Sequence, residues 1–282
     1  MKKKPLSFYF LAAFFGLFIL FLYGPFTAIF LLSLQGPEGQ LTFPMRGFSF
    51  HWLAAVFGEQ RVGSFTDSFG RSFALGLMVM VITVIVSVMG AMAFRRKFIG
   101  SNIIFYLTIS SLIVPSILIS LGIGIVFSLL GLDNQWYSSA LAGHLTWTLP
   151  FAFLIMVGVF NRFNPSYEEA ARDLGASDGT TFWQVVLPLI APSLIGVGLF
   201  GFTLSYDEFT RTSLISGEKN TLPLEIFGMT TNVTSPALYA LGTMTTFFSF
   251  ALIGLTLLAM NYFSNKQQKP IPQGANQPKV QT

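Results

Sequence analysis

The chain has 282 residues, of which 52% are hydrophobic and only 10% are charged, and its net charge is +4. Soluble domains are about 25% charged, so this composition excludes an ordinary soluble protein. Because the sequence has no cysteine and only two histidines, it also excludes disulfides, thiolate metal sites and a histidine-rich metal site.

The apolar residues form long runs, and about 18–20 consecutive apolar residues suffice to cross a bilayer as a helix. Lipid offers the backbone no hydrogen-bond partners, so a spanning segment must be a helix or part of a closed barrel. Barrel strands would alternate polar and apolar residues, which these uniform runs do not do. The sequence therefore predicts an all-α membrane protein.

Six transmembrane helices are predicted, separated by polar segments. In chain order they cover residues 8–34, 72–94, 103–130, 139–160, 189–211 and 237–263. Together they form one six-span domain, 8–265, which contains a long polar loop at 161–188. A short N-terminus, 1–7, precedes this domain, and a Pro/Gln-rich tail, 266–282, is expected to be disordered.

Some local features refine these elements. A short helix on the membrane surface is predicted near 48–57. Pro115 predicts a kink in the third span, and Gly122 and Gly124 predict close helix packing there. His144, in the fourth span, is expected to be a packed, hydrogen-bonded residue and not a ligand.

The distribution of basic residues predicts the topology. Eleven of the 16 Lys and Arg residues fall in segments that lie inside if the N-terminus is inside. Positive residues are enriched in cytoplasmic loops, so both termini and the loop 161–188 are predicted to be cytoplasmic. The same bias accounts for a pI near 9.4 without a nucleic-acid partner.

The polar loop at 161–188 stands out between two apolar spans. Four of the chain's 12 acidic residues lie between Glu168 and Asp178. Most connections are about 4–6 residues long, so this length indicates a docking surface, although a plain connector is the alternative. A two-turn helix is not stable alone in water, so helices here would need a surface to pack against.

Two short helices are predicted within the loop. Ser166 and Glu169 have the spacing of a capping box, which predicts a helix over 167–174. Gly175 fits the end of this helix, where a left-handed residue is favoured. A second helix is predicted at 180–186, capped by Ser177 or Asp178.

The same loop carries a family resemblance. Glu169-Ala170-Ala171, followed by Gly175 and then Leu187-Pro188, resembles the EAA motif of ABC importer permeases. In that family the loop forms a coupling helix that sits in a groove of a cytoplasmic ATPase. The stretch 143–223 is also similar to permeases of spermidine/putrescine importers, through Gly143-His144, Leu149-Pro150-Phe151, Asp173-Leu174-Gly175-Ala176, Ser205-Tyr206-Asp207-Glu208-Phe209 and Thr221-Leu222-Pro223.

The resemblance implies the type I ABC importer permease fold in the bacterial cytoplasmic (inner) membrane. It implies that the residues coupled to the ATPase are Glu168, Glu169, Ala170, Ala171, Asp173 and Gly175. The expected partners are two cytoplasmic ATP-binding subunits, a second permease subunit (a paralogue or a copy), an extracytoplasmic substrate-binding protein and membrane lipid. The sequence has no G-x-x-x-x-G-K-[ST] phosphate loop. We therefore expect ATP–Mg on the partner ATPase, no cofactor on this chain and no enzymatic activity of its own.

Three residues at the outer end of the fifth span, Tyr206, Asp207 and Glu208, are predicted to line the substrate pathway. An acid at the centre of a span costs about 2.5–3.5 kcal/mol to insert, so the outer end or a wet cavity is favoured. There the acids would attract a cation such as a polyamine. Alternatively, they pair with Arg211, whose positive charge would weaken the polyamine prediction.

The predicted function is a permease subunit of a binding-protein-dependent importer, with spermidine or putrescine as the expected substrate. An importer of another small solute, such as aminoethylphosphonate, iron or an opine-like compound, is the alternative. A secondary transporter is less favoured, because it would need no docking loop and should carry more ionisable groups within its spans. A membrane enzyme would need a catalytic cluster, and the sequence predicts neither catalytic nor metal-binding residues.

Overall fold

A computed structural model describes residues 5–58, 64–232 and 235–267 of the chain, and these residues are mostly helical. Its elements, in chain order, are α1 (Leu6–Ser33), α2 (His51–Ala55), α3 (Phe65–Phe94), α4 (Ser101–Ser110), α5 (Ser116–Leu129), α6 (Ser139–Arg162), α7 (Ser166–Asp173), α8 (Asp178–Thr181), the π-helix η1 (Phe182–Val186), α9 (Leu187–Tyr206), α10 (Leu222–Asn232) and α11 (Ala237–Gln267).

Five helices among the described residues are long and apolar enough to cross a membrane. They are α1, α3, α6, the continuous helix from α8 through α9, and α11. They confirm the all-α class and correspond to five of the six predicted spans. The predicted tail, 266–282, lies almost wholly outside the described residues, since α11 continues to Gln267.

The third predicted span, 103–130, is not a single helix. It is divided into α4 and α5, with Pro115 as the residue before α5. Proline offers no N–H to a helix and forces the preceding residue away from the helical conformation. The predicted kink is therefore a complete break. Close packing is absent at Gly122, where an added Cβ would meet nothing within 4 Å, whereas at Gly124 it would lie 3.5 Å from Ile215.

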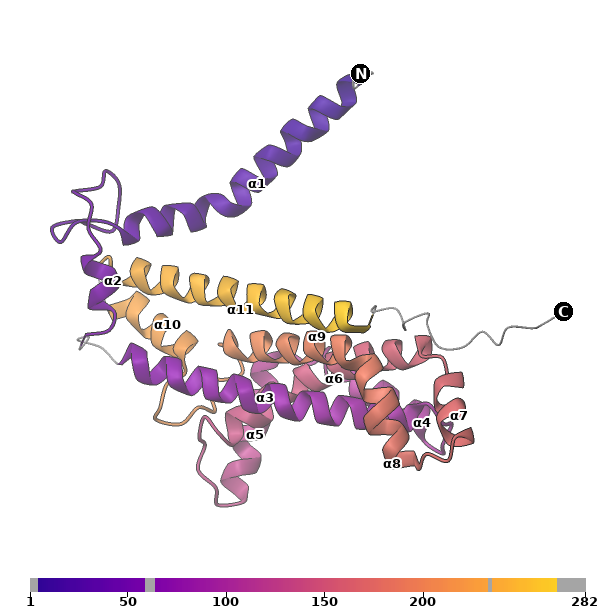
Figure 1. Cartoon of the computed structure of the whole chain (residues 1–282). Coiled ribbons are helices and arrows are strands. Elements are labelled where there is room, and N and C mark those ends of the chain that lie inside the picture. Colours follow the sequence, from indigo (N-terminus) through magenta and orange to yellow (C-terminus); the bar gives the residue numbers. More distant parts are fainter. Residues whose placement is uncertain (1–4, 59–63, 233–234, 268–282) are drawn as a thin grey trace.

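Three helices form the centre of the molecule. α3 packs along both α6 and α9, while α11 lies beside α9 and contacts α1. Figure 1 shows α3, α9 and α11 running side by side, with α1 leaving the bundle at an angle. An apolar cluster that includes Val88, Met156 and Ile190 joins α3, α6 and α9.

Small residues let α3 and α9 approach closely, which is how membrane helices gain packing energy. A Cβ at Gly76 of α3 would lie 2.9 Å from the ring of Phe202 on α9. From the other side, Gly201 faces Thr83, whose methyl group would be 3.4 Å from an added Cβ. A larger residue at Gly76 would therefore force the Phe202 ring to move, whereas an alanine at Gly201 would meet Thr83 at ordinary contact distance.

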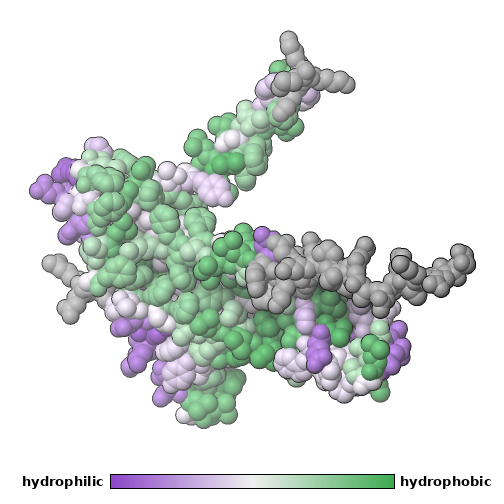
Figure 2. Space-filling view, viewed as in Figure 1, coloured by the Kyte–Doolittle hydropathy of each residue, from purple (hydrophilic) through white to green (hydrophobic). Residues whose placement is uncertain are grey.

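Large apolar side chains are exposed along α1, α3, α5 and α11. Figure 2 shows the apolar surface of one face in green, with hydrophilic residues gathered toward the two ends of the bundle. In the most apolar 18-residue stretch of α6, 44% of the residues are buried within the chain. In the most apolar 18-residue stretch of α1, no residue is buried. α6 therefore faces protein, and α1 presents an apolar surface outward.

Some element boundaries differ from the predictions. α3 begins at Phe65, because the Ser64 side chain accepts a hydrogen bond from the Asp67 N–H and caps the helix. α9 ends at Tyr206, five residues before the predicted end at 211. α10 lies between the fifth and sixth predicted spans, where no helix is predicted.

Candidate functional site

The helices of the polar loop form a compact unit, residues 166–186, which we call the elbow. It consists of α7, α8 and η1, and it continues directly into α9. Figure 1 shows α7 and α8 at one end of the bundle, at the opposite end from α2 and α10. The elbow is therefore placed where a protein outside the membrane could reach it.

The start of α7 differs from the predicted capping box. Ser166 is the first residue of the helix, so its own side chain does not cap it, and Pro165 precedes it. Asn164 instead accepts a hydrogen bond from the Ser166 N–H at 3.1 Å through its side-chain oxygen. The capping-box prediction was wrong because Ser166 already lies within the helix, and Asn164 supplies the side-chain oxygen at its start.

The end of α7 agrees with the prediction. Gly175 has φ +86°, in the left-handed region. Its N–H donates to the Arg172 carbonyl at 2.8 Å, and the Ala176 N–H donates to the Ala171 carbonyl at 3.0 Å. These two bonds form a Schellman motif. Ser177 then caps α8 by accepting from the Thr180 N–H, as predicted.

Most predicted coupling residues lie on the surface of the elbow. Glu169, Ala170, Asp173 and Gly175 are exposed, and Ala171 is half-buried. Arg172 pairs with Asp178 across the corner between α7 and α8, at 3.1 Å, and not with its own helix. Both partners are exposed, so the pair contributes at most about 1 kcal/mol to stability.

Glu168 is the exception, because its carboxylate points inward to Arg95 at the end of α3. Its Oε1 and Oε2 accept hydrogen bonds from Nη1 and Nη2 of Arg95 at 2.8 and 2.6 Å. The hydrogen bond from Arg95 holds the pKa of Glu168 below its ordinary value. Local sequence patterns do not predict this pair, because 73 residues separate Arg95 from Glu168.

The three predicted pathway residues have different environments. Glu208 is buried and forms an ion pair with Arg211, with Oε2 at 3.1 Å from Nη1. The guanidinium of Arg211 also lies over the ring of Trp147, 4.6 Å from its centroid. Asp207 is exposed. Glu208 thus pairs with Arg211, as the alternative interpretation predicted, whereas the carboxylate of Asp207 takes no part in this ion pair.

His144 is buried in a polar network, as expected. Its ring nitrogens lie 2.7 Å from the Ser205 hydroxyl and 2.8 Å from the Thr212 hydroxyl. Both of its hydrogen-bonding positions are therefore occupied within the fold. In the described part of the chain, no group of three or more His, Cys, Asp or Glu residues is placed to hold a metal ion.

A cavity of about 1020 Å³ lies between α1, α9, α10 and α11. Asp207 is the one charged residue among those that line it, and most of the others are apolar or aromatic. Tyr206 and Thr243 also line the cavity, and both carry buried hydroxyls that have no hydrogen-bond partner among the described residues. The cavity therefore combines one carboxylate, aromatic rings and unused hydroxyl groups.

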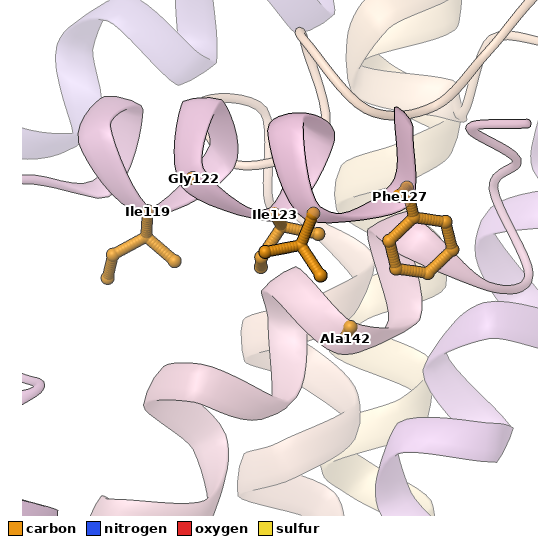
Figure 3. Close-up of a pocket in the computed structure, with 6 residues that line it drawn as sticks. Ile119, Gly122, Ile123, Phe127 and Ala142 are labelled. Atoms are coloured by element: carbon orange, nitrogen blue, oxygen red, sulfur yellow. The ribbon is translucent and has the colours of Figure 1, made fainter. Parts of the chain in front are cut away.

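A second hollow, of about 370 Å³, has a different character. Figure 3 shows it between α5 and α6, where Ile119, Ile123 and Phe127 project from α5 near Ala142. All its lining residues are apolar or glycine, including Gly122. It has no polar group that could orient a hydrophilic solute.

The chain is similar in sequence to polyamine permeases. It is 27% identical over 244 residues to the spermidine/putrescine transport system permease protein PotC of Haemophilus influenzae, covering 86% of this chain and 93% of that protein. It is 24% identical to a PotC homolog of Mycoplasma pneumoniae, covering 98% and 99% of the two chains. It is 25% identical to the putrescine permease PotI of Escherichia coli, covering 79% and 81%.

Solved structures show the same fold. A chain of a bacterial ABC transporter that imports the acidic polysaccharide alginate aligns with a TM-score of 0.60 at 17% identity, covering 96% of this chain and all of that one. A chain of the MetNI methionine ABC transporter aligns with a TM-score of 0.53 at 16% identity, covering 71% and 94%. The family of binding-protein-dependent transport system inner membrane components matches residues 84–269, from within α3 to beyond the end of α11. This helical, multi-pass membrane protein therefore belongs to the family of binding-protein-dependent transport permeases.

Proposed function

We propose that this permease carries polyamines, such as spermidine or putrescine, across the bacterial cytoplasmic membrane. The observation that carries the proposal is the cavity of about 1020 Å³ in which Asp207 is the sole charged lining residue. Acidic residues within membrane helices are energetically costly and therefore rare, and those that occur mark ion and substrate pathways. The similar permeases are named for the transport of spermidine and putrescine, which points to the same class of substrate.

The chemistry of this cavity suits an alkyl chain that carries amines. A carboxylate attracts a protonated amine, and aromatic faces such as those of Tyr206 and Phe250 attract cations through their ring electrons. The apolar walls would contact the methylene groups between the amines. Because Arg211 is already paired with Glu208, its charge is largely compensated and opposes a cation less than the sequence suggested.

The energy source is proposed to lie on other chains. In this proposal two ATPase subunits bind the elbow from the cytoplasm and carry ATP–Mg, while this chain holds no cofactor and catalyses no reaction. A second permease subunit and an extracytoplasmic binding protein complete the importer. Exposed Glu169, Ala170, Asp173 and Gly175 are proposed to contact the ATPase.

The proposed topology places both termini and the elbow in the cytoplasm, which requires an even number of crossings. Five helices are long enough to cross alone, so α4 and α5 together would have to supply the sixth crossing. The six-span domain is then 8–265, with a cytoplasmic N-terminus at 1–7 and a cytoplasmic tail at 266–282.

The test is uptake by the complete complex, purified with its own partner subunits and reconstituted into liposomes. We expect ATP-dependent uptake of labelled putrescine or spermidine, and no uptake of aminoethylphosphonate or ferric iron. Replacing Asp207 with asparagine removes a charged hydrogen-bond acceptor, which is worth about 1.5–3 kcal/mol, so KM should rise about 10- to 100-fold. Glu218→Gln, a change at an exposed acid that does not line the cavity, is the matched control. Uptake of polyamine at wild-type KM by Asp207→Asn would refute the role of the cavity.

A further inference from the structure

The ion pair between Arg95 and Glu168 connects two elements that no short stretch of chain joins. Arg95 directly follows the last residue of α3, and Glu168 lies in the first turn of α7. Both guanidinium Nη atoms bond to separate carboxylate oxygens, at 2.8 and 2.6 Å. Two parallel charged bonds of this kind fix orientation as well as distance.

The surroundings of the pair favour a defined geometry. The Arg95 guanidinium lies 5.4 Å from the ring centroid of Phe160, at the end of α6, and 5.6 Å from that of Phe163. The side chains of Arg95 and Glu168 are only 25% and 12% exposed. The bond to Glu168 raises the pKa of Arg95, and the same bond lowers the pKa of Glu168. Both groups are therefore charged at neutral pH.

α7 needs such an anchor. It has only eight residues, and so short a helix is not stable by itself. It packs on η1 and α8 within the elbow. The Arg95 bond ties it in addition to α3, the helix that packs along both α6 and α9 at the centre of the bundle.

Adjacent glutamates on α7 consequently have different surroundings. Glu168 is buried and bonded to Arg95 at the end of α3, whereas Glu169 is exposed to solvent. A force applied by a partner on the Glu169 side would reach α3 through Glu168 and Arg95. We propose that Arg95 and Glu168 are positioning residues whose ion pair transmits movement of α7 to α3, so that ATP hydrolysis drives transport only while the pair is intact. This inference rests on the proposed docking of ATPase subunits on the elbow.

The experiment uses the complete importer in liposomes and measures uptake and ATP hydrolysis together. Arg95→Gln and Glu168→Gln each break the charged bond. The double exchange Arg95→Glu with Glu168→Arg restores it with reversed polarity. Arg96→Gln is the matched control, because Arg96 is the exposed neighbour of Arg95 and loses the same charge.

We expect each single variant to lose at least ten-fold of its uptake while it still co-purifies with the ATPase and hydrolyses ATP within two-fold of wild type. The double exchange should recover most of the uptake, and Arg96→Gln should behave as wild type. A pair that only stabilised the fold would lower uptake and hydrolysis together, through loss of folded complex.

Four results would overturn the proposal. Either both single variants take up polyamine at the wild-type rate, or they no longer bind the ATPase. Alternatively, Arg96→Gln loses as much uptake as Arg95→Gln, or the double exchange folds but does not recover uptake. If the double exchange does not fold, as judged by gel filtration, the single variants decide by the ratio of uptake to hydrolysis. Failure of the proposed function would differ from all of these, since the wild-type complex would then lack polyamine uptake or an associated ATPase.

Discussion

The buried ion pair of Glu208 and Arg211 provides a test of how the C-terminal end of α9 is built. The two side chains are 7% and 9% exposed, and the carboxylate also accepts a hydrogen bond from the Arg211 N–H at 2.8 Å. The guanidinium stacks over Trp147, and the Arg211 carbonyl accepts a hydrogen bond from Ser120 at 2.8 Å. The perturbation is to remove each charge alone and then both together.

The structure sets the expected magnitudes. Removing one partner of a buried pair leaves the other charge uncompensated, which costs about 3–5 kcal/mol of folding stability. Arg211→Met should be the more costly single change, because it also removes a cation–π contact worth about 0.5–2 kcal/mol. Glu208→Gln keeps an oxygen that can accept the backbone N–H. The double variant should cost less than the sum of the two, with a coupling of about 0.5–3 kcal/mol.

The measurement is reversible unfolding in mixed detergent micelles, followed by circular dichroism as the fraction of denaturing detergent rises. The exposed pair Arg172–Asp178 is the matched control, and Arg172→Met should cost less than about 1 kcal/mol. Loss of less than about 1 kcal/mol in Arg211→Met, together with reduced polyamine uptake by a stable Glu208→Gln variant, would refute the reasoning. Glu208 would then act on the substrate and not on the fold.

Two further predictions concern glycine and pH. Gly217→Ala should prevent folding or destabilise the protein strongly in thermal unfolding, because φ is +72° there and a Cβ would lie 2.1 Å from the Asn134 carbonyl oxygen. Gly175→Ala is the control, because φ is +86° there but nothing lies within 4 Å, so the change should cost only the left-handed backbone strain of about 1–2 kcal/mol. Equal losses of stability in the two variants would contradict this prediction. Because the pKa of Glu168 is lower in the folded protein, its ion pair with Arg95 contributes its full stabilisation above the ordinary pKa of 4.5. This stabilisation is lost as the pH falls through the lower pKa of the folded state. The difference in melting temperature between wild type and Glu168→Gln should accordingly shrink at acid pH, and a constant difference would count against the ion pair.

Hydropathy predicted the membrane helices well, because a span must be long and apolar whatever it packs against. It could not predict the break at Pro115, since proline is tolerated in membrane helices when neighbours satisfy the freed backbone groups. Whether Pro115 kinks or ends a helix depends on the surrounding helices. α10 was missed for a related reason, because it is too short to give a spanning signal.

Local sequence rules also described part of the elbow. Gly175 and Ser177 act within a few residues of themselves, so their roles at helix ends could be predicted. The partner of Glu168 could not be predicted, because Arg95 comes close only when α3 and α7 meet in the fold. The different environments of Asp207 and Glu208 likewise depend on where α9 ends, which hydropathy placed five residues too late.

The π-helix between α8 and α9 has a consequence for the elbow. The Leu187 N–H bonds to the Phe182 carbonyl, five residues back, so this turn holds one more residue than an α-helical turn. Each residue of an α-helix advances the chain by about 100° around the axis. The wider turn absorbs this extra residue, so the elbow leaves α9 in nearly the direction that an uninterrupted α-helix would give it. A deletion of one residue within 182–186 should therefore leave the direction of the elbow almost unchanged, whereas the same deletion within α9 would rotate the elbow by about 100° about the helix axis.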